Sequence, residues 1–188
     1  MIIGVAGKMG SGKDEAFKQM LAYGLDVTQC SFAMRLKQMV NRAWSIPTAD
    51  AIAKPKYVRD LYQKVGTELF RLQVDQNFWV DQLHKDILST HPERIDSKKS
   101  HIVITDVRFG NEAEYVRSHK GFVVKIIRPE GNDVAAAATE AQAAHASEVE
   151  LDSIVPNFEV INDGTKEKLG GKMVYCLDIF LAEKAIRV

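Results

Sequence analysis

Short apolar segments alternate with amphipathic segments along this chain. The first apolar segment, IIGVAG at residues 2–7, is rich in β-branched residues and bounded by glycine, which is typical of a buried strand. Further strands are predicted at 27–32, 101–107, 121–129 and 158–163. The intervening segments repeat their apolar residues at the spacing of one helical face. They predict helices from residue 11, at 33–44, 57–73, 77–89 and 111–119, and through Met173, Leu177 and Leu181.

This alternation predicts the fold class, an α/β protein with a five-stranded parallel sheet and helices on both faces. Ligands of such sheets bind at the carboxyl ends of the strands. Pro47 and Pro55 bracket an expected polar loop, and the alanine-rich residues 130–152 are expected to form an exposed helix or a mobile flap. A chain of 188 residues suits one core, so a single domain is expected over 1–188.

The segment GVAGKMGSGKD at residues 4–14 joins the first strand to the first helix. Its pattern G-x-x-x-x-G-K is that of a loop whose backbone N–H groups wrap nucleotide phosphates while the lysine reaches the β and γ oxygens. Glycine permits positive φ angles and a close approach of the ligand. The positive end of the following helix, expected to begin near Ser11, adds to the attraction. The predicted phosphate-binding residues are Gly7, Lys8, Gly10, Ser11, Gly12, Lys13 and Asp14.

Asp14 stands where such loops usually carry the hydroxyl that binds Mg²⁺. A carboxylate is also a hard oxygen ligand, so Asp14 is predicted to hold the ion directly or through water. The alternative is a favourable charge in the first helical turn, worth about 0.3–1 kcal/mol. Lys8 suggests a different comparison, because GKMGSGK also resembles the loop of partition ATPases, in which an early lysine reaches the partner's nucleotide.

The strand IVITD ends in Asp106, and Arg108 follows two residues later. While the backbone stays extended, both side chains point to the same side. The carboxylate would order the hydration shell of Mg²⁺ or contact the substrate, and the guanidinium would bind phosphate. A simple surface ion pair is the alternative.

Composition narrows the class of partner. Acidic and basic residues balance at 25 each, which argues against a protein that coats nucleic acid or a membrane surface and favours a small-molecule partner. Cys30 and Cys176 lack metal-binding spacing and fit free thiols in a reducing compartment. No apolar run approaches 18 residues and no signal peptide is evident, so a cytoplasmic protein is expected.

Several motifs, taken in order, resemble the phage-encoded deoxynucleoside monophosphate kinases. They are SGKD, VGTELFRLQVDQNFWVDQL at 65–83, IVITDVRFGNEAEYVR at 102–117, KIIRPE, HASE and INDGTKEKL. The resemblance extends more weakly to phosphomevalonate kinases. It implies a P-loop nucleoside monophosphate kinase fold and transfer of the γ-phosphoryl of ATP, with Mg²⁺, to a deoxynucleoside monophosphate. The products would be the deoxynucleoside diphosphate and ADP, and the enzyme would be a homodimer.

The resemblance also implies roles for particular residues. Lys13 would neutralise the moving phosphoryl group. In an acceptor-binding helical region at about 45–95, Arg71 would bind the monophosphate, Glu68 the sugar or base, and Trp79 would form a wall against the nucleoside unless it is a core residue. Beyond that region, Asp106 and Arg108 would serve the metal and the acceptor phosphate, Arg128 would end its strand where a lid-like segment at 130–152 begins, and Asn162 and Gly164 would lie by the adenine.

The chain departs from this family at two places. Glu15 replaces a frequent threonine, and residues 131–147 contain no arginine or lysine for a lid. Arg108, Arg128 or a residue of a second subunit would have to stabilise the phosphoryl group instead. His145 is either a catalytic base or a surface residue. A kinase of another small metabolite, such as phosphomevalonate, and a partition-type ATPase switch remain the alternative functions, and no motif fixes the base or the preference for deoxyribose.

Overall fold

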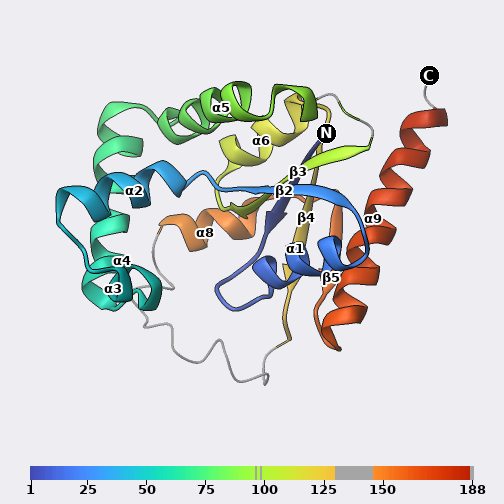
Figure 1. Cartoon of the computed structure of the whole chain (residues 1–188), viewed down its shortest axis with the longest axis horizontal. Helices are drawn as coiled ribbons and strands as arrows, with labels where there is room; N and C mark the ends of the chain where they lie inside the picture. The colour runs from blue at the N-terminus through green and yellow to red at the C-terminus, as the bar shows by residue number, and fades with distance from the viewer. Residues whose placement is uncertain (96, 98, 130–145, 187–188) are drawn as a thin grey trace. The chain divides into compact units, whose positions relative to one another are not determined.

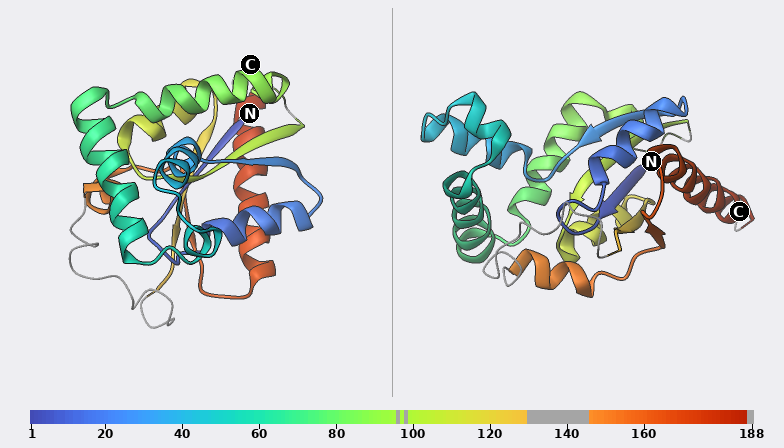
Figure 2. Two further views of the ribbon diagram at one scale, coloured as in Figure 1. Left: turned by 60° about the vertical axis from the view of Figure 1, so that its left-hand side comes forward. Right: turned by 90° about the horizontal axis from the view of Figure 1, so that it is seen from below.

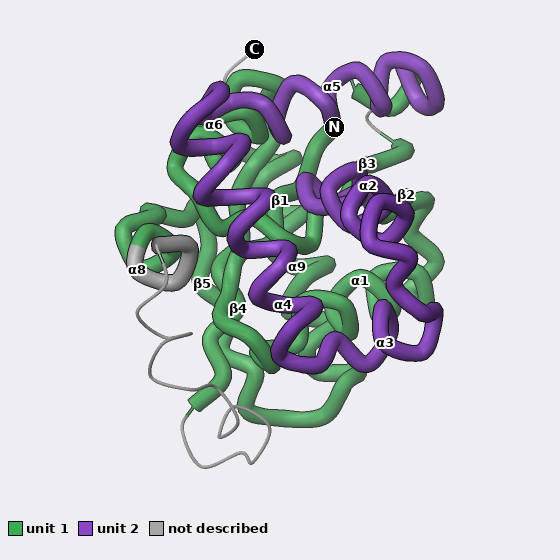
Figure 3. Tube along the Cα trace, turned by 90° about the vertical axis from the view of Figure 1, so that its left-hand side faces the viewer, with its two compact units in different colours: residues 1–29, 93–188 green, residues 30–92 purple. Residues whose placement is uncertain are grey.

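The computed structural model describes residues 1–95, 97, 99–129 and 146–186. The chain divides into two compact units, shown in Figure 3, of which unit 1 comprises Met1–Gln29 and Glu93–Val188 and unit 2 comprises Cys30–Pro92. Most of the expected lid-like segment, including His145, lies outside the described residues.

Unit 1 is built on a five-stranded sheet with the order β2-β3-β1-β4-β5 (Figure 1). The strands are β1 (Ile2–Ala6), β2 (Asp26–Cys30), β3 (Ser100–Val107), β4 (Phe122–Ile127) and β5 (Phe158–Ile161). β1 pairs in parallel with β3 and with β4, and β4 pairs in parallel with β5. The predicted parallel sheet is therefore confirmed, and each strand lies within a few residues of its expected position.

Helices cover both faces of this sheet. They are α1 (Lys13–Ala22), α6 (Gly110–Ser118), α8 (Ala146–Ser153) and α9 (Lys166–Ile186), and a 3-10 turn lies at Pro92–Arg94. Ile3 and Val5 of β1 pack in a core with Met20 of α1 and Met173 of α9. Gly4, between them, faces the opposite way, because a Cβ there would lie 3.0 Å from Cγ2 of Val116 in α6. The right-hand view of Figure 2 shows α1 and α8 on opposite sides of β1.

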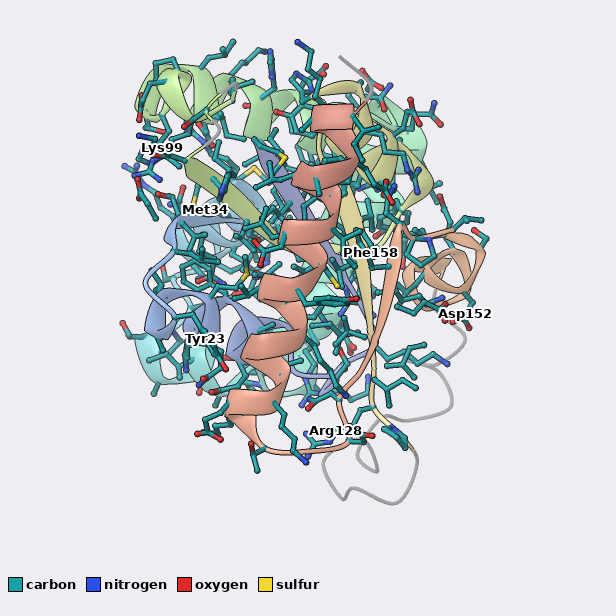
Figure 4. The ribbon with its side chains drawn as sticks, turned by 90° about the vertical axis from the view of Figure 1, so that its right-hand side faces the viewer. Tyr23, Met34, Lys99, Arg128, Asp152 and Phe158 are labelled. Carbon is teal, nitrogen blue, oxygen red and sulfur yellow. The ribbon has the colours of Figure 1, made fainter. Side chains whose placement is uncertain are left out.

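The contact between α1 and α9 fixes the helix that follows the glycine loop. A Cβ added to Gly170 would lie 2.7 Å from Cε2 of Tyr23, so only glycine allows this approach of α9 to α1. The Tyr23 hydroxyl also donates a hydrogen bond of 3.1 Å to the Glu167 carbonyl. In Figure 4, α9 crosses in front of the sheet, with Tyr23 labelled on one side of it and Phe158 of β5 on the other.

Unit 2 is helical: α2 (Met34–Ala43), α3 (Thr48–Ala53), α4 (Lys56–Gln63), a π-helix η1 (Lys64–Val74) and α5 (Phe78–Thr90). The expectation of a polar loop between Pro47 and Pro55 is wrong, because helix α3 lies between these two prolines. The two prolines are the N-cap residues of α3 and α4. A helix start does not need their missing N–H groups, so proline there does not break the structure. The helix expected at 57–73 is divided between α4 and η1.

His101 of β3 is buried with 3% of its surface exposed. Burial, reinforced by the nearby N-terminal ammonium group, lowers the pKa of this imidazole to about 4. The folded protein therefore holds His101 neutral at a pH at which the unfolded chain, with a pKa near 6.5, binds a proton. The stability that depends on the neutral ring is complete above pH 6.5 and is lost as the pH falls toward 4.

We expect the free energy of unfolding to fall by about 1–2 kcal/mol between pH 7 and pH 5 through His101 alone. Urea denaturation of the wild type and of His101→Gln at both pH values measures this, and the variant should lose that part of the pH dependence. His91→Gln, at the end of α5, is the control and should keep it. An equal pH dependence in the wild type and His101→Gln would contradict the assignment.

Candidate functional site

The glycine loop has the backbone conformation that its sequence predicts. Gly7, Gly10 and Gly12 have φ angles of 150°, 78° and 106°, which side-chain-bearing residues rarely adopt. A Cβ on Gly7 would lie 2.5 Å from the Ser11 hydroxyl oxygen and 2.6 Å from the Ile126 carbonyl oxygen. Ser11 is itself buried, and its hydroxyl has no hydrogen-bond partner among the described residues. Gly7 therefore has no room for a side chain, because the loop packs closely against Ser11 and the end of β4.

Lys13 lies with its ammonium group over this loop. Its Nζ donates to the Gly7 carbonyl at 2.6 Å and to the Lys8 carbonyl at 2.8 Å. Both acceptors belong to the loop, so the charge is held where a phosphate group in the loop would meet it. The ammonium group is therefore held against the loop backbone.

Helix α1 begins at Lys13, two residues later than expected, because Gly12 has a left-handed backbone and serves as its N-cap. No side chain caps this helix, and its first turn contains Asp14 and Glu15. The N–H groups of a first helical turn have no partner within the helix and favour an anion. These N–H groups of α1 therefore favour the phosphate binding that the loop's sequence predicts.

Gln29, at the end of β2, connects Asp14 to the neighbouring strand. Its Nε2 donates to Asp14 Oδ1 at 3.1 Å and to the Thr105 hydroxyl of β3 at 2.9 Å. This contact holds the predicted metal ligand beside the strand that carries Asp106. Sequence reasoning missed Gln29, because only the sheet order makes the ends of β2 and β3 neighbours.

The donor set fits Mg²⁺ bound together with a nucleotide. The described residues contain no group of three or more side chains suited to a metal ion. Mg²⁺ commonly uses one or two carboxylates and completes its shell with water and phosphate oxygens. Asp14 and Asp106 are carboxylates of that kind.

A bulge in β3 lies next to Asp106 and Arg108, whose side chains were expected to point to the same side of an extended strand. Gly4 and Ala6 of β1 pair with Ile104 and Val107, so two residues of β3, Thr105 and Asp106, oppose one residue of β1. Simple alternation of side chains does not hold across a bulge. The two residues are half-buried at the carboxyl end of β3, but strand geometry alone does not place both side chains on one side.

Glu112 holds the backbone around Arg108. This buried carboxylate accepts hydrogen bonds from the N–H of Arg108 at 2.8 Å and of Phe109 at 3.2 Å. The N–H of Gly110 donates to Glu150 of α8 at 3.0 Å. Sequence reasoning missed Glu112, because the N-cap of α6 is Phe109, whereas the capping-box signature has Ser or Thr at that position.

Two further strand ends meet the glycine loop. Arg128, labelled in Figure 4 beyond the end of β4, lies with Nη1 3.4 Å from the Gly10 carbonyl. Asn162, after β5, donates from Nδ2 to the Ser11 carbonyl at 2.9 Å. Gly164 is exposed. Lys8 lies 3.6 Å from Asp152 of α8 in the same chain, an exposed pair.

The predicted acceptor residues lie in unit 2. Arg71 is buried, and its Nη1 donates to the Gln76 carbonyl at 3.0 Å. Trp79 is 4% exposed, and its indole N–H donates to the Gly66 carbonyl at 2.9 Å. Glu68 is exposed. Trp79 is thus a core residue of unit 2, which was the alternative to a wall against the nucleoside.

Trp79 also lines a cavity of about 610 Å³ within unit 2, a size that suits a small molecule. Its lining residues are Arg35, Gln38, Met39, Arg42, Ala43, Phe78, Trp79 and Gln82. Arg35 is already bound to Asp86, with Nε 2.8 Å from Oδ2. Sequence reasoning missed the α2 side of this cavity, although Arg35, Gln38 and Arg42 recur at helical spacing.

A model of the deoxynucleotide monophosphate kinase family matches residues 48–173. The chain belongs to this family. The matched segment begins after the glycine loop, so the geometry of that loop is a separate observation. No described helix is sufficiently long and apolar to cross a membrane.

Relatives and solved structures agree with this assignment. One relative is a protein of Acanthamoeba polyphaga mimivirus named "Putative deoxynucleotide monophosphate kinase". It is 29% identical over 197 residues, and the match covers 95% of this chain and 96% of the relative. Shikimate kinases of Aquifex aeolicus and Acinetobacter baumannii superpose with TM-scores of 0.51 and 0.52 at 14% and 15% identity. These cover 95% and 97% of this chain and 96% and 94% of their own, and they show a P-loop kinase fold. This family member is an ATP-dependent phosphotransferase and a nucleotide kinase.

Gly12 and Gly24 provide a matched pair for testing the loop. Both have positive φ, at 106° and 82°, but a Cβ on Gly12 would lie 2.5 Å from Asn162 Nδ2, whereas a Cβ on Gly24 meets nothing within 4 Å. Gly24→Ala should therefore cost only backbone strain, about 1–2 kcal/mol of stability, and leave ATP affinity unchanged.

Gly12→Ala should in addition weaken ATP binding by about tenfold or more, since the loop backbone or Asn162 must move. Calorimetric titration and thermal unfolding of both variants measure the two effects. Unchanged ATP affinity in Gly12→Ala would show that this part of the loop does not contact the nucleotide.

Proposed function

We propose that this kinase transfers the γ-phosphoryl group of ATP to a deoxynucleoside monophosphate, giving the deoxynucleoside diphosphate and ADP. Membership of the deoxynucleotide monophosphate kinase family is the observation that carries this proposal. The glycine loop and the charged groups around it support the phosphoryl-transfer part. The acceptor's identity is the part that experiment must establish.

Phosphoryl transfer asks a protein mainly to position its substrates and to stabilise spread negative charge. The loop amides and Lys13 would bind the phosphates of ATP, whose oxygens would take over the bonds that Lys13 makes to the Gly7 and Lys8 carbonyls. Arg128, beside Gly10, and Arg108 would stabilise the transferred group. The acceptor phosphate is already anionic, so no strong base is needed.

Asp14 and Asp106 would hold Mg²⁺, which neutralises phosphate charge when it is bound. Gln29 would keep Asp14 in place through its bond to Oδ1. Gly164 stays a candidate for the adenine side. Lys8 contacts Asp152 within its own chain, so the contact gives no support to a partition-type role across a dimer. A homodimer and a cytoplasmic location stay predictions.

The direct test of the reaction measures ADP formation with ATP and Mg²⁺ in the presence of each deoxynucleoside or ribonucleoside monophosphate. We expect ADP formation to depend on one or more deoxynucleoside monophosphates, and Lys13→Ala to lose most of it. The exposed Lys18→Ala, in the same helix, is the control and should retain activity. ADP formation that no nucleoside monophosphate stimulates would refute the proposal.

Two arginines of unit 2 are candidates for the acceptor phosphate. The family resemblance favours Arg71, and the cavity favours Arg42, which lines it together with Gln38 and Phe78. A guanidinium binds phosphate bidentately, and the aromatic and amide groups suit a nucleobase. We propose that the cavity holds the acceptor.

Arg42→Ala should raise the KM for the monophosphate about tenfold and leave the KM for ATP unchanged, because a charge-assisted bond is lost. Lys85→Ala removes a positive charge from α5 outside the cavity lining and should change neither value. Arg71→Ala discriminates the candidates. A selective rise in the KM for the monophosphate in Arg71→Ala alone would move the acceptor phosphate to Arg71.

A further inference from the structure

We propose that Asn162 is a positioning residue of the glycine loop, which holds the Ser11–Gly12 peptide so that the Gly12 N–H faces the bound phosphate. The family resemblance implies that Asn162 lies by the adenine. Its contacts in the structure indicate a different role. This inference rests on the proposed phosphate binding by the loop.

Asn162 is itself held firmly at the carboxyl end of β5. Its backbone N–H donates to the Ile127 carbonyl at the end of β4, with a nitrogen–oxygen distance of 2.7 Å. From this fixed position its Nδ2 donates to the Ser11 carbonyl at 2.9 Å, across 151 residues of sequence. The end of the sheet thus contacts the loop backbone through one side-chain amide.

The same amide packs against Gly12. A Cβ on Gly12 would lie 2.5 Å from Asn162 Nδ2 and 3.5 Å from Leu169 Cδ2 of α9. Position 12 therefore requires glycine, because a side chain there would collide with the Asn162 amide. Close packing and the hydrogen bond fix the same peptide unit.

Because a peptide unit is planar, the hydrogen bond from Asn162 to the Ser11 carbonyl also orients the Gly12 N–H. The described residues contain no cis peptide, so the Ser11 carbonyl and the Gly12 N–H point in opposite directions. Because Asn162 holds the carbonyl on the β5 side, the N–H is presented on the other side. None of the hydrogen bonds among the described residues uses this N–H. A donor to the carbonyl also polarises the peptide and strengthens its N–H as a donor.

Asn157 is a matched control within the same strand pair. It precedes β5, and its Oδ1 accepts a hydrogen bond of 2.9 Å from the Val123 N–H. Asn157 and Asn162 therefore both connect β5 to β4, at the amino and the carboxyl end respectively. Only Asn162 contacts the glycine loop.

The experiment titrates the wild type, Asn162→Ala and Asn157→Ala with ATP and with inorganic tripolyphosphate in the presence of Mg²⁺. We expect Asn162→Ala to raise both dissociation constants by a similar factor of about two- to tenfold, the loss typical of one hydrogen bond. The KM for the acceptor should not change. Asn157→Ala should leave both dissociation constants at the wild-type value.

Three outcomes would overturn the inference. A loss of affinity for ATP alone would make Asn162 an adenine contact, and a loss for neither ligand would make the bond irrelevant to binding. An equal loss in Asn157→Ala would indicate general loosening of the β4–β5 pair. Should Asn162→Ala fail to fold, Asn162→Asp, which places an oxygen against the Ser11 carbonyl, should weaken both ligands. Tripolyphosphate binding needs no acceptor, so these outcomes stand whichever acceptor the enzyme uses.

Discussion

The structure depends on a turn between β1 and α1 that must keep its backbone amides uncovered while it remains rigid. Glycine satisfies the first requirement, because Gly7, Gly10 and Gly12 have positive φ angles. Rigidity has to come from outside the turn, since glycine restricts the backbone least. The side chains at neighbouring strand ends provide that support, and the turn's own Ser11 is buried.

The sheet order explains why these supports meet. β1 lies at the centre, between β3 and β4, where the direction of strand succession reverses, and ligands of parallel sheets bind at such a point. Arg128 after β4 and Asn162 after β5 consequently contact carbonyls of the loop. Gln29, at the carboxyl end of β2, reaches Asp14 at the start of α1. Four segments far apart in sequence thus determine one phosphate site.

The sequence predicted the features that depend on local patterns. The strands, most of the helices and the glycine loop follow from apolar spacing and from one motif. Features that depend on tertiary neighbours were not predictable: Gln29 and Asn162 act through residues remote in sequence. The bulge in β3 is invisible to an alternation argument, and the prolines at 47 and 55 suggested a loop where they begin helices. The cavity of unit 2 is lined by α2 and α5 together. The acceptor-binding region expected from the sequence, at about 45–95, included α5 and left out α2.

The central claim, that the loop amides bind the phosphates of a nucleotide, is tested most directly by titrating ¹⁵N-labelled protein with ADP and Mg²⁺ and following the amide resonances. The account predicts large, saturable shifts for Gly10, Gly12 and Lys13, with little change at Gly24 in the turn after α1. Saturable binding that leaves the loop resonances unchanged, or no binding at all, would contradict it.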